Sequence, residues 1–135
     1  MIEFRNVSKT YKSKKKVTTE ALKNVSFTLP NTGMVFILGK SGSGKSTLLN
    51  ILGGLDNCDS GEIYVDSKKI SNFKENDYDY YRNTYVGFIF QEFNLIEEYN
   101  VYDNISLGLK LQKEKVKKEQ LDQILELSLI HISEP

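Results

Sequence analysis

Residues 39–47 constrain the fold of this chain more strongly than any other stretch. They match every fixed position of the phosphate-binding pattern G-x-x-x-x-G-K-[ST]. That pattern requires a strand before the loop and a helix after it. The apolar run Met34–Leu38 predicts a buried strand, and Ser46–Leu52, with Leu and Ile at helical spacing, predicts a helix that ends at Gly53. The stretch therefore predicts a P-loop in an α/β fold.

The residue types of this loop suit a nucleoside triphosphate. Gly42 and Gly44 lack a Cβ, so the backbone can curl around phosphate oxygens with its N–H groups pointing inward. Lys45 supplies a positive charge for the β- and γ-phosphates, and the Ser46 hydroxyl is suited to bind Mg²⁺. The alternative is a chance Gly/Ser-rich turn, which the flanking strand and helix disfavour. The other cradle positions are Gly39, Lys40, Ser41, Ser43 and Thr47.

Composition narrows the function classes. The 18 basic and 18 acidic residues balance, which argues against general affinity for polyanions, and Lys14–Lys16 is interpreted as a solvated loop. One cysteine, Cys58, excludes an internal disulfide and suits a reducing cytoplasm. No stretch approaches the roughly 20 apolar residues of a membrane span, and the N-terminus lacks a signal-peptide pattern. We expect a soluble chain, one domain by length, that works at a membrane only through a partner.

Strands are predicted before the P-loop, whereas many P-loop proteins begin almost at the loop. Ile2–Phe4, continued by Val7, and Val25–Leu29 alternate apolar and polar residues and predict an antiparallel element. Glu62–Val65 predicts a further short strand, and Val86–Phe90 is nearly all apolar, as in a buried parallel strand. These elements predict a mixed sheet around the loop.

Three further helices are predicted after the P-loop helix. The first is Asp77–Tyr85, with Asn76 or Asp77 as its N-cap; its stripe of tyrosines is interpreted as packing rather than a ligand platform. The second begins after the N-cap Asn100, with Asp103 near the capping-box position. The tyrosine stripe consists of Tyr78, Tyr81 and Tyr85. The second helix is predicted at Val101–Leu111. The third, amphipathic helix is predicted at Lys113–Glu126, and its apolar side consists of Val116, Leu121, Ile124 and Leu125.

Several segments together resemble the ATP-binding subunits of ABC transporters. The resemblance covers residues 1–126 and is closest to the lipoprotein-releasing, macrolide-exporting and antimicrobial-peptide-resistance branch. Lys40 departs from the family, which usually has Pro there, but the cradle does not use that side chain. The matching segments are Tyr11, the P-loop, Gly53–Asp56, Ser60–Ile63, Val86–Leu95 (the Q-loop segment) and Val101–Ile105.

The resemblance implies roles for residues. Tyr11 would stack on adenine, although a packing tyrosine at a strand end remains the alternative. Gly39–Thr47 would bind the phosphates, with Lys45 catalytic and Thr47 near the α-phosphate. Gln91 would help to bind Mg²⁺ together with Ser46, sense the attacking water and place its loop against a membrane permease. The implied cofactors are ATP and Mg²⁺.

The implied fold is an α/β P-loop NTPase of ABC type, with N-terminal antiparallel strands, part of the parallel core sheet and the start of the helical subdomain. The implied function is that of an ATP-binding subunit that dimerises and drives a permease, cytoplasmic and peripheral at the inner face of the cell membrane. No nucleic-acid partner is expected. The main alternative is a non-transport ABC-type ATPase acting on nucleic acid or the ribosome. A nucleotide kinase or GTPase is disfavoured because Asn-Lys-x-Asp motifs are absent.

Several family features do not occur in the 135 residues. There is no Leu-Ser-Gly-Gly-Gln-type signature and no apolar strand ending in Asp-Glu after Gln91, and His131 lies in the wrong context for the switch histidine. We therefore expect residues 1–126 to be the N-terminal part of a nucleotide-binding domain, inactive alone and prone to aggregate. Its core-sheet side chains Ile37, Leu38, Phe88 and Phe90 would be exposed. Residues 127–135 read like translated transposon-end adapter sequence, which the source nucleotides can test.

Overall fold

The computed structural model describes residues 1–13, 17–92, 94–112 and 117–129 of the chain. The chain divides into two compact units, Met1–Val86 and Gly87–Pro135. Each unit has its own elements and is described by itself. The predicted solvated loop Lys14–Lys16 lies outside the described residues.

The first unit is built on an antiparallel sheet of order β2-β1-β3-β4. Its strands are β1 (Ile2–Lys12), β2 (Thr18–Leu29), β3 (Ser60–Val65) and β4 (Lys68–Lys69). The long β1 pairs with β2 on one side and with β3 on the other, so that Phe4 lies opposite both Phe27 and Ile63. The predicted strands at 2–7, 25–29 and 62–65 are confirmed, and the short β4 adds a strand that was not predicted.

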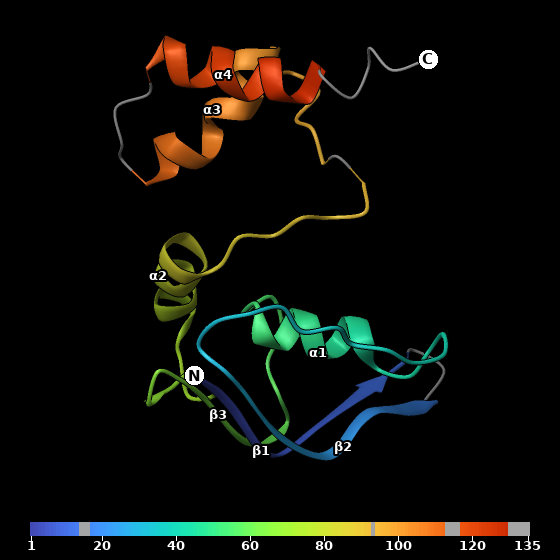
Figure 1. Cartoon of the computed structure of the whole chain (residues 1–135). Coiled ribbons are helices and arrows are strands. Elements are labelled where there is room, and N and C mark those ends of the chain that lie inside the picture. The colour runs from blue at the N-terminus through green and yellow to red at the C-terminus, as the bar shows by residue number, and fades with distance from the viewer. Residues whose placement is uncertain (14–16, 93, 113–116, 130–135) are drawn as a thin grey trace. The chain divides into compact units, whose positions relative to one another are not determined.

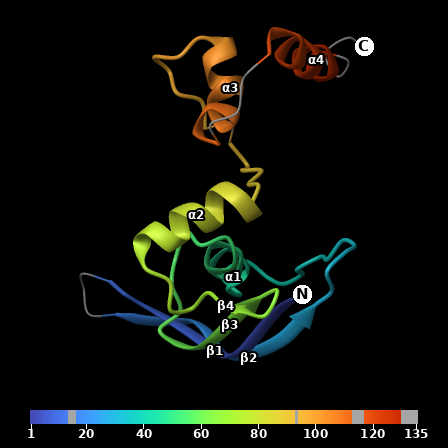
Figure 2. The ribbon, with the colours of Figure 1, turned by 90° about the vertical axis from the view of Figure 1, so that its left-hand side faces the viewer.

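Two helices of this unit lie on the same side of the sheet (Figures 1 and 2). They are α1 (Lys45–Leu52), which confirms the predicted helix after the P-loop, and α2 (Glu75–Tyr85). Apolar side chains from the sheet and both helices form one core, because each element has one apolar face that water would otherwise contact. The core residues are Phe4, Val7, Leu22, Ile51, Ile63, Ile70, Tyr78 and Tyr81.

The two apolar runs predicted as buried strands, the second of them parallel, are not strands in the structure. Met34–Leu38 and residues 86–90 have no assigned strand, and every pairing in the sheet is antiparallel. Leu38 is 88% exposed and Ile89 101% exposed. The prediction that the described residues include part of a parallel core sheet is therefore wrong. A buried parallel strand needs hydrogen-bonded neighbours, and these runs have none among the described residues. The exposure prediction holds for Leu38 and Phe90, while Ile37 and Phe88 are half-buried.

Helix α2 confirms the packing interpretation for two of its three tyrosines. Tyr78 and Tyr81 are buried, and their hydroxyls donate to the carbonyls of Ile70 and Leu52, each at 2.9 Å. Tyr85 is exposed and stacks on Tyr81. The predicted N-cap, Asn76 or Asp77, is wrong. The cap is Lys74, whose backbone N–H donates to the Asp77 carboxylate three residues later.

The second unit contains α3 (Val101–Leu111) and α4 (Lys118–Leu129). Asn100 caps α3 as predicted, since its side-chain oxygen accepts from the Asp103 N–H at 2.9 Å. The Asn104 side chain bonds both backbone groups of Ile96 and so holds the turn before the helix. In α4, Leu121 is buried and Leu125 half-buried, whereas Ile124 is 47% exposed. Val116 lies outside the described residues.

Helix α4 includes the first three residues of the predicted adapter-derived tail, 127–129. Residues 130–135, His131 among them, lie outside the described part, so the origin of the tail stays a prediction. Among the described residues, no helix has the length and apolar character needed to cross a membrane.

Candidate functional site

The P-loop lies where β2 approaches the start of α1. Gly44 is the residue before the helix and has a left-handed φ of 89°. A Cβ at this position would lie 2.3 Å from the carbonyl oxygen of Ala21 in β2. Both the backbone conformation and the close approach therefore require glycine, and this packing holds the loop against the sheet.

The start of α1 is suited to bind an anion. The first turn of a helix has N–H groups without intrahelical partners, and the aligned peptide dipoles place positive charge there. In α1 no side chain caps these groups and the first turn holds no acidic residue. Gly42, with a φ of 75°, has nothing within 4 Å of the place where a Cβ would lie. The loop thus leaves room beside unpaired donors, which is the arrangement that phosphate groups need.

Lys45 is held on the loop itself. Its ammonium Nζ donates to the carbonyl oxygens of Gly39 at 2.8 Å and Lys40 at 2.7 Å. The Lys40 carbonyl also accepts from the Ser43 N–H at 3.2 Å, so Lys40 contributes its backbone to the loop. These contacts hold the ammonium of Lys45 against the backbone of the P-loop.

A pocket of about 240 Å³ joins the P-loop to Tyr11. Tyr11 lies near the end of β1, and the pairing of β1 with β2 brings its ring beside the loop. The structure therefore unites two features that lie far apart in the sequence and that were predicted to share one ligand. The lining residues are Tyr11, Thr19, Ala21, Gly42, Gly44, Lys45, Ser46 and Thr47.

Tyr11 is anchored by two residues that sequence reasoning missed as site residues, Asp56 and Lys9. The Tyr11 hydroxyl donates to Asp56 Oδ2 at 2.7 Å, and Lys9 Nζ donates to Asp56 Oδ1 at 2.7 Å. Lys9 is 9% exposed, and its ammonium lies 5.2 Å from the centre of the Tyr11 ring. The alternation of β1 places Lys9 and Tyr11 on one face of the strand, which was the available signal.

The pKa shifts agree with this geometry. The Asp56 carboxylate accepts the phenolic hydrogen bond and, with burial, raises the pKa of Tyr11, while a side-chain hydrogen bond with Thr47 of the P-loop acts in the opposite direction. Burial acts to raise the pKa of Asp56, but the hydrogen bonds from Lys9, Tyr11 and the Asn57 N–H outweigh it and lower the pKa. Asp56 is therefore a charged acceptor at neutral pH.

The other predicted site residues differ in whether they line the P-loop pocket. Ser46 is exposed and Thr47 half-buried, and both line the pocket; Gly39, Ser41 and Ser43 belong to the loop but do not line it. Gln91 is exposed and belongs to the second unit, so its joint role with Ser46 stays a prediction. Within the described residues, no group of three or more His, Cys, Asp or Glu side chains could hold a metal. The Ser46 hydroxyl, which lines the pocket, is an oxygen donor of the kind that Mg²⁺ binds.

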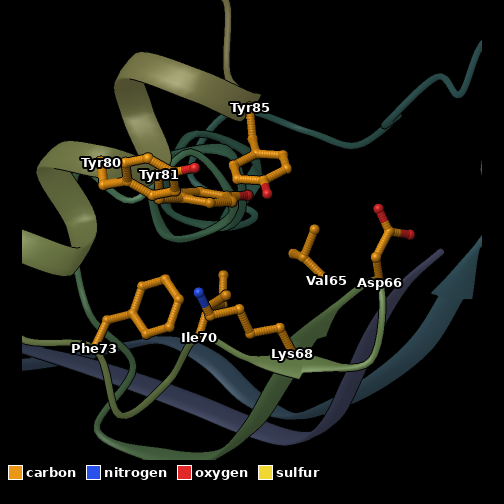
Figure 3. Close-up of a pocket in the computed structure, with 8 residues that line it drawn as sticks. All are labelled: Val65, Asp66, Lys68, Ile70, Phe73, Tyr80, Tyr81 and Tyr85. Carbon is orange, nitrogen blue, oxygen red and sulfur yellow. The ribbon is translucent and has the colours of Figure 1, made fainter.

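A second pocket, of about 160 Å³, lies between α2 and the β3–β4 hairpin (Figure 3). Tyr80, Tyr81 and Tyr85 lie on the helix side and Val65 and Lys68 on the strand side. The Tyr81 hydroxyl is used by Leu52, and Asp66 pairs with the N-terminal amine. Two polar groups of this pocket are thus bonded within the fold.

A family model for the ABC transporter domain matches residues 22–133. The chain belongs to the ABC transporter family. This finding agrees with the P-loop geometry, and members of the family bind ATP with Mg²⁺. It confirms the predicted resemblance and does not favour the alternative of a nucleic-acid-acting ATPase.

Relatives within the ABC transporter family include ATP-binding proteins of several systems. The methionine import ATP-binding protein MetN 1 of Staphylococcus epidermidis is 41% identical over 93% of this chain and 37% of the relative. The lipoprotein-releasing system ATP-binding protein LolD of Francisella tularensis is 39% identical over 90% of this chain and 52% of the relative. The chain thus spans between about a third and a half of the curated relatives that it matches.

Solved ABC cassettes share the fold. A dimeric structure of MJ0796, described as a bacterial ABC transporter cassette, has a TM-score of 0.82 at 38% identity and matches 93% of this chain and 55% of that one. A second dimeric MJ0796 structure, in a post-hydrolysis state bound to ADP and Pi, has a TM-score of 0.80 at 37% identity over 91% and 53% of the two chains. The predicted ABC-type fold is therefore confirmed as part of such a cassette.

Proposed function

We propose that this chain binds MgATP in the P-loop pocket as part of an ATP-binding subunit of an ABC transporter. The observation that carries the proposal is the pocket that Tyr11 shares with five residues of the P-loop, Gly42, Gly44, Lys45, Ser46 and Thr47. The α1 N–H groups and Lys45 would bind the phosphates, and the Tyr11 ring would stack on the base. The Ser46 hydroxyl would bind Mg²⁺, which neutralises charge on the phosphate oxygens.

We further propose that the subunit dimerises and acts with a membrane permease at the inner, cytoplasmic face of the cell membrane. The dimeric MJ0796 cassettes and the import and lipoprotein-releasing relatives support this. The loop around Gln91 would contact the permease, and Gln91 would join Ser46 in binding Mg²⁺. Lys45 and Gln91 are the residues of this chain to which we assign catalytic roles in ATP hydrolysis.

Binding of ATP by the purified chain, with and without Lys45→Ala, tests the nucleotide site. Isothermal titration in Mg²⁺ should show that Lys45→Ala lowers the ATP affinity by about tenfold or more, because the variant removes a charge-assisted contact to phosphate. Lys23→Ala is the matched control, since Lys23 is 76% exposed and contacts Glu20. Equal ATP affinity of the native chain and Lys45→Ala, or no ATP binding by a folded native chain, would overturn the proposal.

A further inference from the structure

We propose that Asp56 is a positioning residue that holds the Tyr11 ring at the P-loop pocket, ready to receive the base of the nucleotide. The inference rests on the proposed function of this pocket and goes beyond it by naming the residue that orients the base-stacking ring. Lys9 supports Asp56 from the buried side. Neither Asp56 nor Lys9 lines the pocket, so both act through Tyr11.

The Tyr11 ring needs an anchor. Its side chain lies near the end of β1 and is 40% exposed, so packing alone leaves the ring free to adopt other rotamers. The hydroxyl bond to Asp56 at 2.7 Å fixes the far end of the ring. A ring held at both ends loses less side-chain entropy when a base stacks on it, which increases affinity without a new contact.

The Asp56 carboxylate is itself fixed. One of its carboxylate oxygens accepts from Lys9 Nζ, and the same oxygen accepts from the Asn57 N–H at 2.7 Å. Lys9 Nζ also donates to the Asn57 carbonyl at 2.6 Å. The carboxylate is therefore left with one free oxygen, and that oxygen accepts from Tyr11.

The loop that carries Asp56 is hydrogen-bonded to the backbone of β1. The Asp59 N–H donates to the Ser8 carbonyl at 2.9 Å, and the Thr10 N–H donates to Asp59 Oδ2 at 2.6 Å. Tyr11 and its anchor thus share one rigid base, and this base continues through β1 into the sheet that also supports the P-loop. The ring is held in register with the phosphate site by the fold itself.

The test compares ATP with inorganic tripolyphosphate, which has the phosphates but no base. In Tyr11→Phe the ring remains but the hydroxyl bonds to Asp56 and to Thr47 are lost, so the ATP affinity should fall by about three- to tenfold, the cost of ordering one side chain. Tripolyphosphate affinity should not change. Asp56→Ala should show the same selective loss, and adding it to Tyr11→Phe should cause little further loss, as expected for two residues that act as a unit.

The control is Tyr64→Phe, which removes a tyrosine hydroxyl bonded to a carboxylate, that of Glu62 at 3.1 Å, away from the pocket. It should leave both affinities unchanged. Asp56→Ala removes the carboxylate partner of Lys9 and can reduce folding. If that variant does not fold, the Tyr11→Phe result alone tests the inference. Unchanged ATP affinity in Tyr11→Phe, or equal losses for ATP and tripolyphosphate, would overturn the inference while leaving the phosphate site intact. If the native chain binds neither ligand, the proposed function fails, and the inference fails with it.

Discussion

Two kinds of apolar segment in this chain behave differently, although both have the composition of strands. The alternating runs of β1, β2 and β3 pair with one another and place Phe4, Val7 and Ile63 in a core. The near-continuous runs Met34–Leu38 and 86–90 form no strand, and Leu38, Phe36 and Ile89 are at least three-quarters exposed. Composition therefore does not decide burial; the presence of a pairing partner does.

The difference follows from how each kind of sheet satisfies its backbone. An antiparallel strand that alternates can leave one face wet and needs few neighbours, whereas a continuous apolar strand is stable only when sheet and helices cover both faces. Substitutions that remove equal apolar groups from the two kinds of segment should separate them clearly.

The largest expected effect comes from Ile63→Ala compared with Leu38→Ala. Ile63 is 2% exposed in β3, so truncation should lower the free energy of unfolding by about 2–5 kcal/mol through lost burial and the cavity that remains. Leu38 is 88% exposed, and its truncation should change stability little. Urea denaturation followed by circular dichroism measures both variants. A comparable loss in Leu38→Ala would show that the run is packed in solution.

A smaller effect is expected where α2 joins the core. Tyr81→Phe removes the hydroxyl that donates to the Leu52 carbonyl and should cost about 1–2 kcal/mol, because a partly buried acceptor loses its partner. Tyr80→Phe is the control, since Tyr80 is 57% exposed and its ring keeps the edge contact with Tyr85. Thermal unfolding of the two variants gives the comparison, and equal midpoints would show that the Tyr81 bond adds nothing to stability.

Sequence reasoning predicted what local chemistry decides. The P-loop helix was predicted because Leu and Ile recur at helical spacing up to Gly53. The Asn100 cap was predicted because an Asx side chain three residues before Asp103 is a local signal. The lengths of β1 and β2 were underestimated, since polar residues such as Lys9 and Thr10 interrupt the pattern. Pairing with a neighbouring strand, which the local pattern does not report, extends both strands.

The candidate site was predicted only in part for the same reason. The P-loop and Tyr11 were found from motif and spacing, and the structure places both on one pocket. Asp56 was noted as part of a family segment, but its contact with Tyr11 depends on how the loop after α1 returns to β1. A side chain that acts through another residue leaves no local pattern, so three-dimensional structure was needed to find it.

The two helix starts extend the comparison to capping. Helix α3 has the Asn100 side chain on the Asp103 N–H, whereas α1 has no side-chain cap. Asn100→Ala should therefore destabilise α3 by about 1 kcal/mol. Faster hydrogen exchange confined to the first turn of α3 would confirm it, and Asn83→Ala in α2 is a control away from any helix start. Unchanged exchange in Asn100→Ala would mean that the turn held by Asn104 stabilises the helix start without the cap.

The smallest effect is expected in acid, at the contact between the sheet and the loop after α1. The pKa of Asp56 is below its ordinary value in the folded chain, so between the folded and unfolded pKa values the unfolded chain binds more protons. The contribution of Asp56 is thus complete above the unfolded value near 3.8 and is lost as the pH falls through the folded pKa. Stability measured by urea denaturation between neutral pH and acid should fall less steeply at the acid end in Asp56→Asn. Glu3→Gln is the comparison, because solvent screens its pair with Arg5, which is 52% exposed, and a smaller change of slope is expected there. A larger change of slope in Glu3→Gln than in Asp56→Asn would show that pairing with the buried Lys9 does not make Asp56 the stronger contributor to acid sensitivity.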